Sequence, residues 1–486
     1  MDCIPLPVTA DIQYHFVLLL RLLFAGAVAY IFVYGINQAF LSVRSLMVRP
    51  KANAAPPDPE VWPALTVQLP VFNEPLVIGR LLDAVSALHY PKGLLDVQIL
   101  DDSTDETKRL IDDRLAVWDH SRIRVKLMRR SVRTGYKAGA LAESSPTGEL
   151  VAIFDADFVP APDFLLRTVP YFRDATVGCV QAAWGFLNRQ ENLYTRLQAI
   201  GLAGHFAVEQ PARNGSGWMS AFNGTCGVWR ASAIRAAGGW QADTLTEDLD
   251  LSMRAQLFGW KIVYQPDIQV PGELPADLSA VRTQQFRWSR GGAQTGRKLS
   301  WSLLRKPMPF GRRWQAFLQV NASSLWVFVL LAAISGILLS MLPAVDGFPW
   351  WSGLGWLSLM ASAAFVFFHM VSVRQAGLGY GDYLLIPVFL VLAAGWAPHL
   401  ARAVVGGWLG MNTPFIRTPK TGGQSVPVSR MAWQGLPELL IGTIVLLVIL
   451  TRPVDPVTIG FQVMLSAGCL CNGILLMFPD MMRHNG

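Results

Sequence analysis

Long apolar segments at both ends of the chain most constrain what it can fold into. Residues 14–41 (YHFVLLLRLLFAGAVAYIFVYGINQAFL) exceed the roughly 20 residues that cross a bilayer. Four further stretches, 319–342, 350–373, 433–451 and 457–479, are long enough to be spans. Since 52% of the residues are hydrophobic and only 15% are charged, composition argues against a wholly soluble protein.

The charges beside the first span predict its orientation. Arg44, Arg49 and Lys51 follow the span, whereas Asp2 and Asp11 precede it. The positive-inside rule therefore places the N-terminus outside and residue 50 in the cytoplasm. The net charge of +7 fits cytoplasmic-side lysines and arginines. Because the polar part has no basic stripe with stacking aromatics, we expect no nucleic-acid partner.

The segment 382–407 is apolar at first and then contains Pro398, His399 and Arg402. If it crossed the bilayer, the basic residues of 417–430 would lie outside. We therefore interpret it as interfacial or re-entrant, which leaves five spans with the C-terminus inside. The sequence thus predicts a multi-pass protein of the inner (plasma) membrane with a cytoplasmic catalytic domain.

Between the apolar ends, the pattern over 62–300 is α/β. Predicted strands are LTVQLPVF (65–72), DVQIL (96–100), RIRVKLM (122–128) and the run that begins at 151, with helical segments at 76–89 and 134–144. Alternating strands and helices predict a doubly wound, Rossmann-like, mostly parallel sheet. We divide the chain into an N-terminal transmembrane helix (1–50), a cytosolic domain ending in interfacial helices (51–310) and a C-terminal transmembrane domain (311–486). The five cysteines show no metal-binding spacing, so we expect neither a zinc site nor a disulfide.

Two carboxylates follow a buried strand in the stretch VAIFDAD (151–157). In open α/β sheets ligands bind beyond the carboxyl ends of the strands, where Asp155 and Asp157 would lie. Such an oxygen-rich site suits Mg²⁺ or Mn²⁺ together with substrate phosphates. The alternative is a turn with aspartate caps, which is equally common for an isolated motif.

Polar residues also follow the two preceding strands. Asn73 and Glu74 come after the first, and Asp101-Asp102-Ser103-Thr104-Asp105 after the second. At the same edge of the sheet they could accept hydrogen bonds from a ribose or a base. Arg133 and Lys137 add positive charge beside a helix N-terminus that can bind a diphosphate.

Thr246, Glu247 and Asp248 lie at the start of a helix predicted over 249–258. One interpretation is an N-cap cluster that the helix dipole stabilises. The other is a general base, because a helix N-terminus keeps a carboxylate ionised, although it also lowers its basicity. We favour Asp248 as the base because of the residues that surround it in the sequence.

The stretch VRTQQFRWSRGG (281–292) places Gln284, Arg287 and Trp288 on one helical face. Arginine binds phosphate with two hydrogen bonds, and tryptophan stacks on sugars. The same pattern fits an amphipathic helix lying on a membrane, and the two interpretations are compatible.

Together these motifs resemble the signature of processive family 2 glycosyltransferases such as cellulose synthase. The set consists of Asp102, Asp155-Ala-Asp157, Thr246-Glu-Asp248 and Gln284-x-x-Arg287-Trp288. The sequence is more similar still to the plant cellulose-synthase-like A and C proteins, which make β-mannan and the glucan backbone of xyloglucan. The motifs that carry this similarity are LDDSTDET, GYKAGAL, VAIFDADFVP, FNGTCGVWR and QQFRWS. The resemblance covers roughly 65–300 and implies a GT-A-like α/β fold for this domain, joined to an α-helical transmembrane domain.

The resemblance implies a role for each matching residue. Asp102 would contact the base or ribose, Asp157 would hold the metal, and Asp155 would support metal and nucleotide. Lys137 would help to bind the nucleotide, and Asp248 would take the acceptor's proton. Gln284, Arg287 and Trp288 would hold the diphosphate and the acceptor's terminal sugar.

The segment 412–425 resembles the gating loop of cellulose synthase, with Phe415, Thr418 and Lys420 at matching positions. Arg417 departs from that motif, which usually has valine there. The short stretch after residue 480 leaves no room for the cyclic-nucleotide sensor of bacterial cellulose synthases, so we expect no regulation of that kind.

These expectations define an inverting membrane glycosyltransferase. It would transfer a hexosyl unit from UDP-glucose or GDP-mannose to the non-reducing end of a β-glucan or β-mannan and translocate the polymer. Two alternatives remain: a lipid glycosyltransferase acting on ceramide or diacylglycerol, and a transporter or scaffold with a degenerate cytosolic domain. The shape of the pocket around Asn73, Trp184 and Cys226 would decide between UDP-glucose and GDP-mannose as the donor, and sequence alone does not give that shape.

Overall fold

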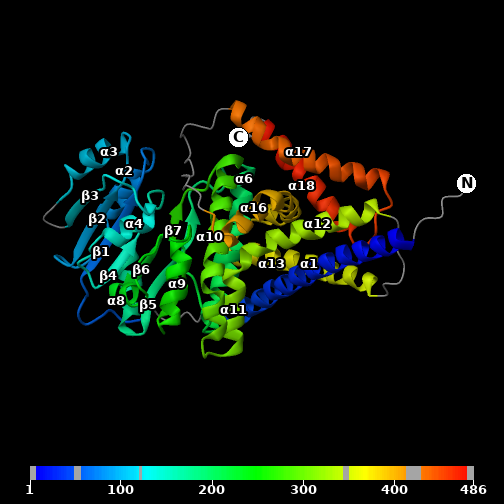
Figure 1. Cartoon of the computed structure of the whole chain (residues 1–486). Coiled ribbons are helices and arrows are strands. Elements are labelled where there is room, and N and C mark those ends of the chain that lie inside the picture. Colours follow the sequence, from blue (N-terminus) through cyan, green and yellow to red (C-terminus); the bar gives the residue numbers. More distant parts are fainter. Residues whose placement is uncertain (1–6, 49–55, 120–122, 343–349, 412–427, 479–486) are drawn as a thin grey trace, which may run out of the picture.

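The computed structural model describes residues 7–48, 56–119, 123–342, 350–411 and 428–478. An α/β unit lies at one end of the molecule and a group of long helices at the other (Figure 1). The α/β unit is built on a seven-stranded sheet of order β3-β2-β1-β4-β6-β5-β7. Its strands are β1 (Leu65–Val71), β2 (Leu95–Asp101), β3 (Arg124–Arg129), β4 (Leu150–Ile153), β5 (Val177–Phe186), β6 (Gly227–Arg230) and β7 (Lys261–Gly272).

The sheet is mostly parallel, as predicted, with one strand reversed. Strand β6 runs antiparallel to β4 and β5, whereas β1 pairs in parallel with β2 and β4, and β2 pairs in parallel with β3. The carboxyl ends of β1, β2 and β4 therefore meet at one edge. The four predicted strands match β1 to β4, whereas β5, β6 and β7 were not predicted from the sequence.

Helices cover both faces of the sheet, which explains why its central strands are almost continuously apolar. Val67, Leu69 and Ile99 belong to the core on one face, and Val151 and Ile153 to the core on the other. The shorter helices of this unit are α2 (Ile78–Ser86), α3 (Thr107–Leu115), α4 (Tyr136–Glu143), α5 (Phe164–Thr168), η1 (Val169–Arg173), α8 (Ala231–Ala236) and α9 (Glu247–Leu257).

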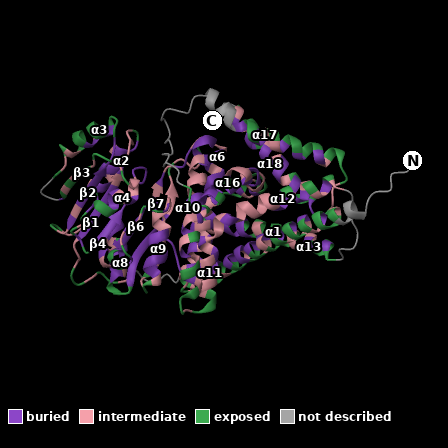
Figure 2. Cartoon of the chain, viewed as in Figure 1, coloured by how far each residue is buried: buried purple, intermediate pink, exposed green. Residues whose placement is uncertain are grey.

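Among the described residues, four helical segments are long and apolar enough to cross a membrane, or five if one bent pair counts as a span. The helices of the four segments are α1 (Pro7–Met47), η3 with α12 (Ala322–Ser324 and Leu325–Met341), α13 (Trp351–Gln375) and α18 (Ile459–Met477). They match four predicted spans. The fifth, 433–451, falls on α17 (Val428–Thr451), whose described apolar part, Gly435–Thr451, is shorter than those four. Many residues of α1, α13 and α17 are exposed (green in Figure 2), as lipid contact requires.

The ambiguous segment 382–407 forms the bent pair. Short helix α14 (Tyr380–Tyr383) leads into α15 (Ile386–Gly395), and α16 (Ala397–Trp408) leaves at a bend of 53°. Helix α15 packs against α18 through glycines, because a Cβ at Gly395 would lie 2.1 Å from the backbone carbon of Gly468. This geometry fits a broken span or a re-entrant segment.

A layer of helices that includes α10 (Leu278–Arg305) and α11 (Phe310–Val320) lies between the sheet and the long helices (Figure 1). The other helices that belong to it are α6 (Leu193–Ala203), the π-helix η2 (Gly204–Glu209) and α7 (Gln210–Gly215). Helix α10 packs on α16, and η2 packs on α1 and α13.

A buried carboxylate fixes α6 to the apolar helices. Asp382, 1% exposed, pairs with Arg189 and with Arg196, whose Nη2 lies 2.9 Å from Oδ1. The same side chain accepts a hydrogen bond from the backbone N–H of Gly379 at 3.0 Å. One carboxylate thus joins two arginines near α6 to the turn that precedes α15.

Replacing Asp382 by asparagine should destabilise the protein by about 3–5 kcal/mol, because two arginines lose their buried counter-charge. Thermal unfolding of the purified protein in detergent measures the effect. Asp113→Asn is the matched control, since Asp113 forms an exposed pair with Arg109 that is worth about 0–1 kcal/mol. Equal shifts in the two variants would contradict the anchoring role.

Candidate active site

A cavity of about 680 Å³ opens at the carboxyl edge of the sheet, between the ends of β1, β2 and β4 and the helices α9 and α10. Most of the site residues predicted from the sequence line it. They are Glu74, Asp102, Lys137, Asp155, Asp157, Glu247, Asp248, Gln284, Arg287 and Trp288. The proposed gating residues Phe415, Thr418 and Lys420 lie outside the described residues, and their role stays a prediction.

Among the predicted site residues that the structure describes, Asn73 alone does not line the cavity. Its backbone adopts a left-handed conformation with φ of 54°. Its N–H donates to Ser103 Oγ at 2.9 Å, and its Oδ1 accepts from the N–H of Thr104 at 2.7 Å. Asn73 therefore ties the end of β1 to the end of β2, an arrangement that positions Asp102.

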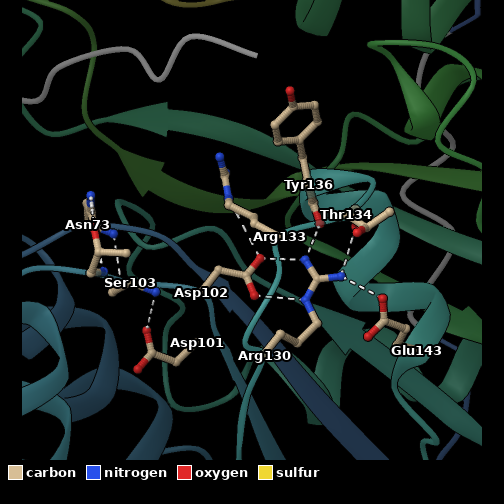
Figure 3. A network of polar contacts seen from close by, with 10 residues as sticks. Asn73, Asp101, Asp102, Ser103, Arg130, Arg133, Thr134, Tyr136 and Glu143 are labelled. Carbon is tan, nitrogen blue, oxygen red and sulfur yellow. Dashed lines mark hydrogen bonds and ion pairs between the residues drawn. The ribbon is translucent and has the colours of Figure 1, made fainter. Parts of the chain in front are cut away.

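The Asp102 carboxylate forms ion pairs with Arg130 and Arg133 (Figure 3). Arg130 donates from Nε to Oδ1 at 2.8 Å and from Nη2 to Oδ2 at 2.5 Å, and Arg133 Nε lies 3.7 Å from Oδ2. Hydrogen bonding to Asp102 raises the pKa of Arg130, although burial opposes this. Both carboxylate oxygens are therefore engaged, so any base or ribose contact would share them with arginine.

Arg130 was missed in the sequence, although strand register could have identified it. Asp101 pairs with Arg129 across β2 and β3, so Asp102 faces Arg130 one residue later. Arg130 also donates to the carbonyl oxygens of Thr134 and Tyr136 (Figure 3). It therefore holds the loop before α4 in place. Arg133, from the same loop, stacks its guanidinium on the Phe72 ring at 3.5 Å.

Lys137, in the first turn of α4, joins three parts of the cavity wall. Its Nζ lies 2.6 Å from Asp155 Oδ1 and 2.9 Å from the carbonyl oxygen of Gly224. Burial opposes its charge, but the carboxylates around it prevail and the pKa of Lys137 is raised. The ammonium group therefore stays charged beside the position where a diphosphate would approach.

Asp155 and Asp157 follow β4 and supply carboxylates to the cavity wall. Within the described part of the chain, no group of three or more His, Cys, Asp or Glu side chains could hold a metal ion. Two hard oxygen ligands nevertheless fit Mg²⁺ or Mn²⁺, since such ions usually take their remaining ligands from water and substrate phosphates.

Glu247 and Asp248 occupy the first turn of α9, and Thr246 makes no side-chain capping bond there. Burial, followed by repulsion from Glu247, raises the pKa of Asp248 to about 7, although its Oδ1 accepts from the N–H of Leu249. Burial also raises the pKa of Glu247. We expected the helix N-terminus to lower basicity at this position; the enclosed cavity outweighs the helix dipole.

Helix α10 brings the remaining side chains to the cavity. Gln284, Arg287 and Trp288 line it from one face of the helix, and the Trp288 ring lies 6.5 Å from that of Trp184. Burial lowers the pKa of Arg287, opposed by Glu247 and Asp155. Close approach of α9 and α10 requires Gly291, where a Cβ would lie 2.5 Å from Thr246 Cγ2.

A second cavity, of about 250 Å³, adjoins the first and shares Leu202, Gln284 and Trp288 with it. It reaches among α6, α10, α12, α15 and the start of α16. Aromatic and amide side chains predominate in its lining, among them Tyr194, Gln198, Gln285, Trp326, Phe389 and Trp396. This cavity was not predicted from the sequence, because its residues come from distant helices and form no local motif.

Comparison with known proteins gives the chain its family. The family described as "Glycosyltransferase like family 2" matches residues 63–291. "Glucomannan 4-beta-mannosyltransferase 1" of Oryza sativa subsp. japonica is 45% identical over 259 residues, which are 51% of this chain and 50% of that protein. "Glucomannan 4-beta-mannosyltransferase 2" of Arabidopsis thaliana is 43% identical over 251 residues, which are 50% of this chain and 47% of that protein.

A longer match is to "Probable glucomannan 4-beta-mannosyltransferase 2" of Oryza sativa subsp. japonica, 36% identical over 392 residues, 76% of this chain and 66% of that protein. In the matches of about 45% identity, the chain spans about half the length of the curated relatives. A solved mannosyltransferase, PcManGT from Pyrobaculum calidifontis, shares the fold, with a TM-score of 0.51 and 21% identity over 80% of this chain and 99% of that one. The chain belongs to the family 2 glycosyltransferases and is related to the plant glucomannan 4-β-mannosyltransferases.

Proposed function

We propose that this protein is an inverting β-mannosyltransferase that extends a β-1,4-linked mannan from GDP-mannose. The observation that carries the proposal is the enclosure of Asp248 with Lys137 and Arg287 in one cavity. A proton acceptor and two cations are the groups that sugar transfer from a diphosphate needs. The mannosyl donor is favoured over UDP-glucose because the relatives are named as glucomannan mannosyltransferases.

The transfer is a single displacement at the anomeric carbon. The acceptor oxygen forms a bond to that carbon as the bond to the diphosphate oxygen breaks, and the electron pair leaves with the diphosphate. Asp248 accepts the proton of the acceptor hydroxyl, while Lys137 and Arg287 neutralise the leaving group. One displacement inverts an α-linked donor to a β-linked product. Trp288 offers a flat face for the acceptor's terminal sugar, and Gln284 a hydrogen-bonding partner.

A divalent cation, when bound, would neutralise charge on the departing diphosphate, and Asp155 with Asp157 would hold it. The solved Pyrobaculum calidifontis mannosyltransferase was obtained with GDP-mannose and Mn²⁺, which makes these the probes of choice. Asp102 remains our candidate for recognition of the base or ribose, backed by Arg130, with Glu74 and Glu247 completing the wall.

The second cavity favours a polymer over a glycolipid product. A growing chain leaving Trp288 would enter a passage that already holds two more tryptophans and two amides, and aromatic faces with amide groups suit sugars. We therefore propose that the product passes among the apolar helices of 311–486. The same proposal keeps the α/β domain of 51–310 on the cytoplasmic side of the membrane, with residues 1–50 as a transmembrane helix.

The product assay tests the proposal as a whole. Purified protein with Mn²⁺ should incorporate label from GDP-mannose into a polymer that endo-β-1,4-mannanase digests, and EDTA should abolish incorporation. UDP-glucose serves as the competing donor. Label recovered as a short glycolipid in organic solvent would support the lipid glycosyltransferase instead, and no turnover with any nucleotide sugar would support the scaffold.

Asp248→Asn should lower kcat by about 10²–10⁴-fold, because the acceptor hydroxyl loses its base. Labelled mannose incorporation measures the rate, and nucleotide-sugar binding should change little. Asp113→Asn, on the exposed surface of α3, should retain the wild-type rate. Wild-type incorporation by Asp248→Asn membranes would refute the mechanism.

The pH dependence follows from the raised pKa of Asp248, about 7. The base works only when deprotonated, so kcat should fall as pH drops below about 7, approaching tenfold per pH unit at lower pH. A pH–rate profile between pH 5 and 8.5 at saturating donor checks this. A flat acid limb down to pH 5 would exclude Asp248 as a base of this pKa.

A further inference from the structure

The motif FNGT (222–225) carries an asparagine that the mechanism above does not use. Asn223 lines the main cavity and is half-buried. Its side-chain Nδ2 lies 2.8 Å from Nε2 of His205, and its Oδ1 accepts from Gln210 Nε2 at 3.0 Å. Its backbone N–H donates to Gln181 Oε1 at 2.9 Å. Every one of these contacts comes from a different element, so the position of Asn223 depends on tertiary structure.

The direction of the amide is fixed by its neighbours. Gln210 donates from Nε2 to the carbonyl oxygen of Ala221 and accepts on Oε1 from the N–H of the same residue. That two-way contact identifies which end of Gln210 is the donor, so Asn223 must present Oδ1 to it. Nδ2 of Asn223 therefore faces His205, and His205 Nε2 has to be an acceptor.

His205 is consequently the tautomer that carries its proton on Nδ1. This nitrogen lies 3.1 Å from Glu209 Oε2. Burial opposes the charge of Glu209, but hydrogen bonding from His205 and the charge of Arg213 lower its pKa to about 2. An anionic carboxylate thus holds the imidazole by Nδ1–H and leaves Nε2 directed at the amide, the arrangement that orients ligand and catalytic histidines.

The relay continues into the first long helix. Gln38 of α1 donates to the other oxygen of Glu209, Oε1, at 2.8 Å. His205 and Glu209 both belong to the π-helix η2, an irregularity that often marks functional sites. Both side chains lie between Gln38 of α1 and Asn223 of the FNGT loop.

We propose that His205 and Glu209 are positioning residues that hold the Asn223 amide as a hydrogen-bond donor toward a sugar hydroxyl in the cavity. The inference rests on the proposed sugar transfer. One Nδ2 hydrogen of Asn223 points at His205, and in this proposal the second donates to the substrate. Because only that hydrogen serves the sugar, the relay selects for a hydroxyl acceptor at one position of the hexose, and Asn223 is a specificity-determining residue.

A double-mutant cycle on the full-length protein tests this, with GDP-mannose incorporation as the readout. His205→Leu and Asn223→Ala should each lower kcat/KM by roughly tenfold, the effect of one oriented hydrogen bond. Combined, they should lower it no further than either alone. His205→Gln should restore most of the activity, since its amide oxygen can accept from Asn223 in place of Nε2. The exposed His89→Leu is the matched control and should have wild-type kinetics.

The outcomes separate this inference from the function on which it rests. If the wild type transfers no sugar from any donor, the proposed function fails. If the wild type is active but His205→Leu equals it, or if the two losses multiply, the relay does not act through Asn223. Thermal unfolding of each variant runs in parallel. Should His205→Leu fail to fold, His205→Ala and His205→Gln replace it, and equal losses in these two would also overturn the proposal.

Discussion

The structure depends on the burial of several charged side chains together in one cavity. Three carboxylates, Asp155, Glu247 and Asp248, line one cavity together with Lys137 and Arg287. Each charge would be costly there alone, because burial disfavours ionised groups. Lys137 pairs directly with Asp155, whereas burial prevails at Glu247 and at Asp248, whose pKa is raised to about 7. The same balance that makes the cavity tolerable makes one of its acids a usable base.

Helix α10 connects this chemistry to the membrane. It begins at Leu278 with Asp277 accepting from the N–H of Ala280, contributes one face to the cavity and packs another against α16. The second cavity joins Trp288 of α10 to residues of the apolar helices α12 and α15. Further contacts join the α/β unit, through the helices beside it, to the apolar helices. They are the ion pairs of Asp382, the hydrogen bonds that lead from Gln38 to Asn223, and the close approach of α9 to Gly291 of α10.

Local patterns predicted much of the fold and of the site. Strands β1 to β4 and the long apolar helices were recognisable because burial on both faces and lipid contact each leave a simple signature of apolar runs. Strands β5 to β7 were missed. Strand β7 is interrupted by polar and proline residues, and β6 is only four residues long. Most cavity residues stood at strand ends or on one helical face, where spacing alone groups them.

The linear order of residues was enough to determine which acids and which Gln-x-x-Arg-Trp face could act, because each group forms a short contiguous motif. Only tertiary structure decided how they act. Burial of Asp248 raises its pKa against the effect of the helix dipole. Asp102 pairs with Arg130, which follows the neighbouring strand. Asn73 hydrogen-bonds to the loop after β2. Tertiary structure also built the relay through His205 and the aromatic second cavity. These features depend on burial and on contacts between distant segments, and neither has a signature within any short stretch of the chain.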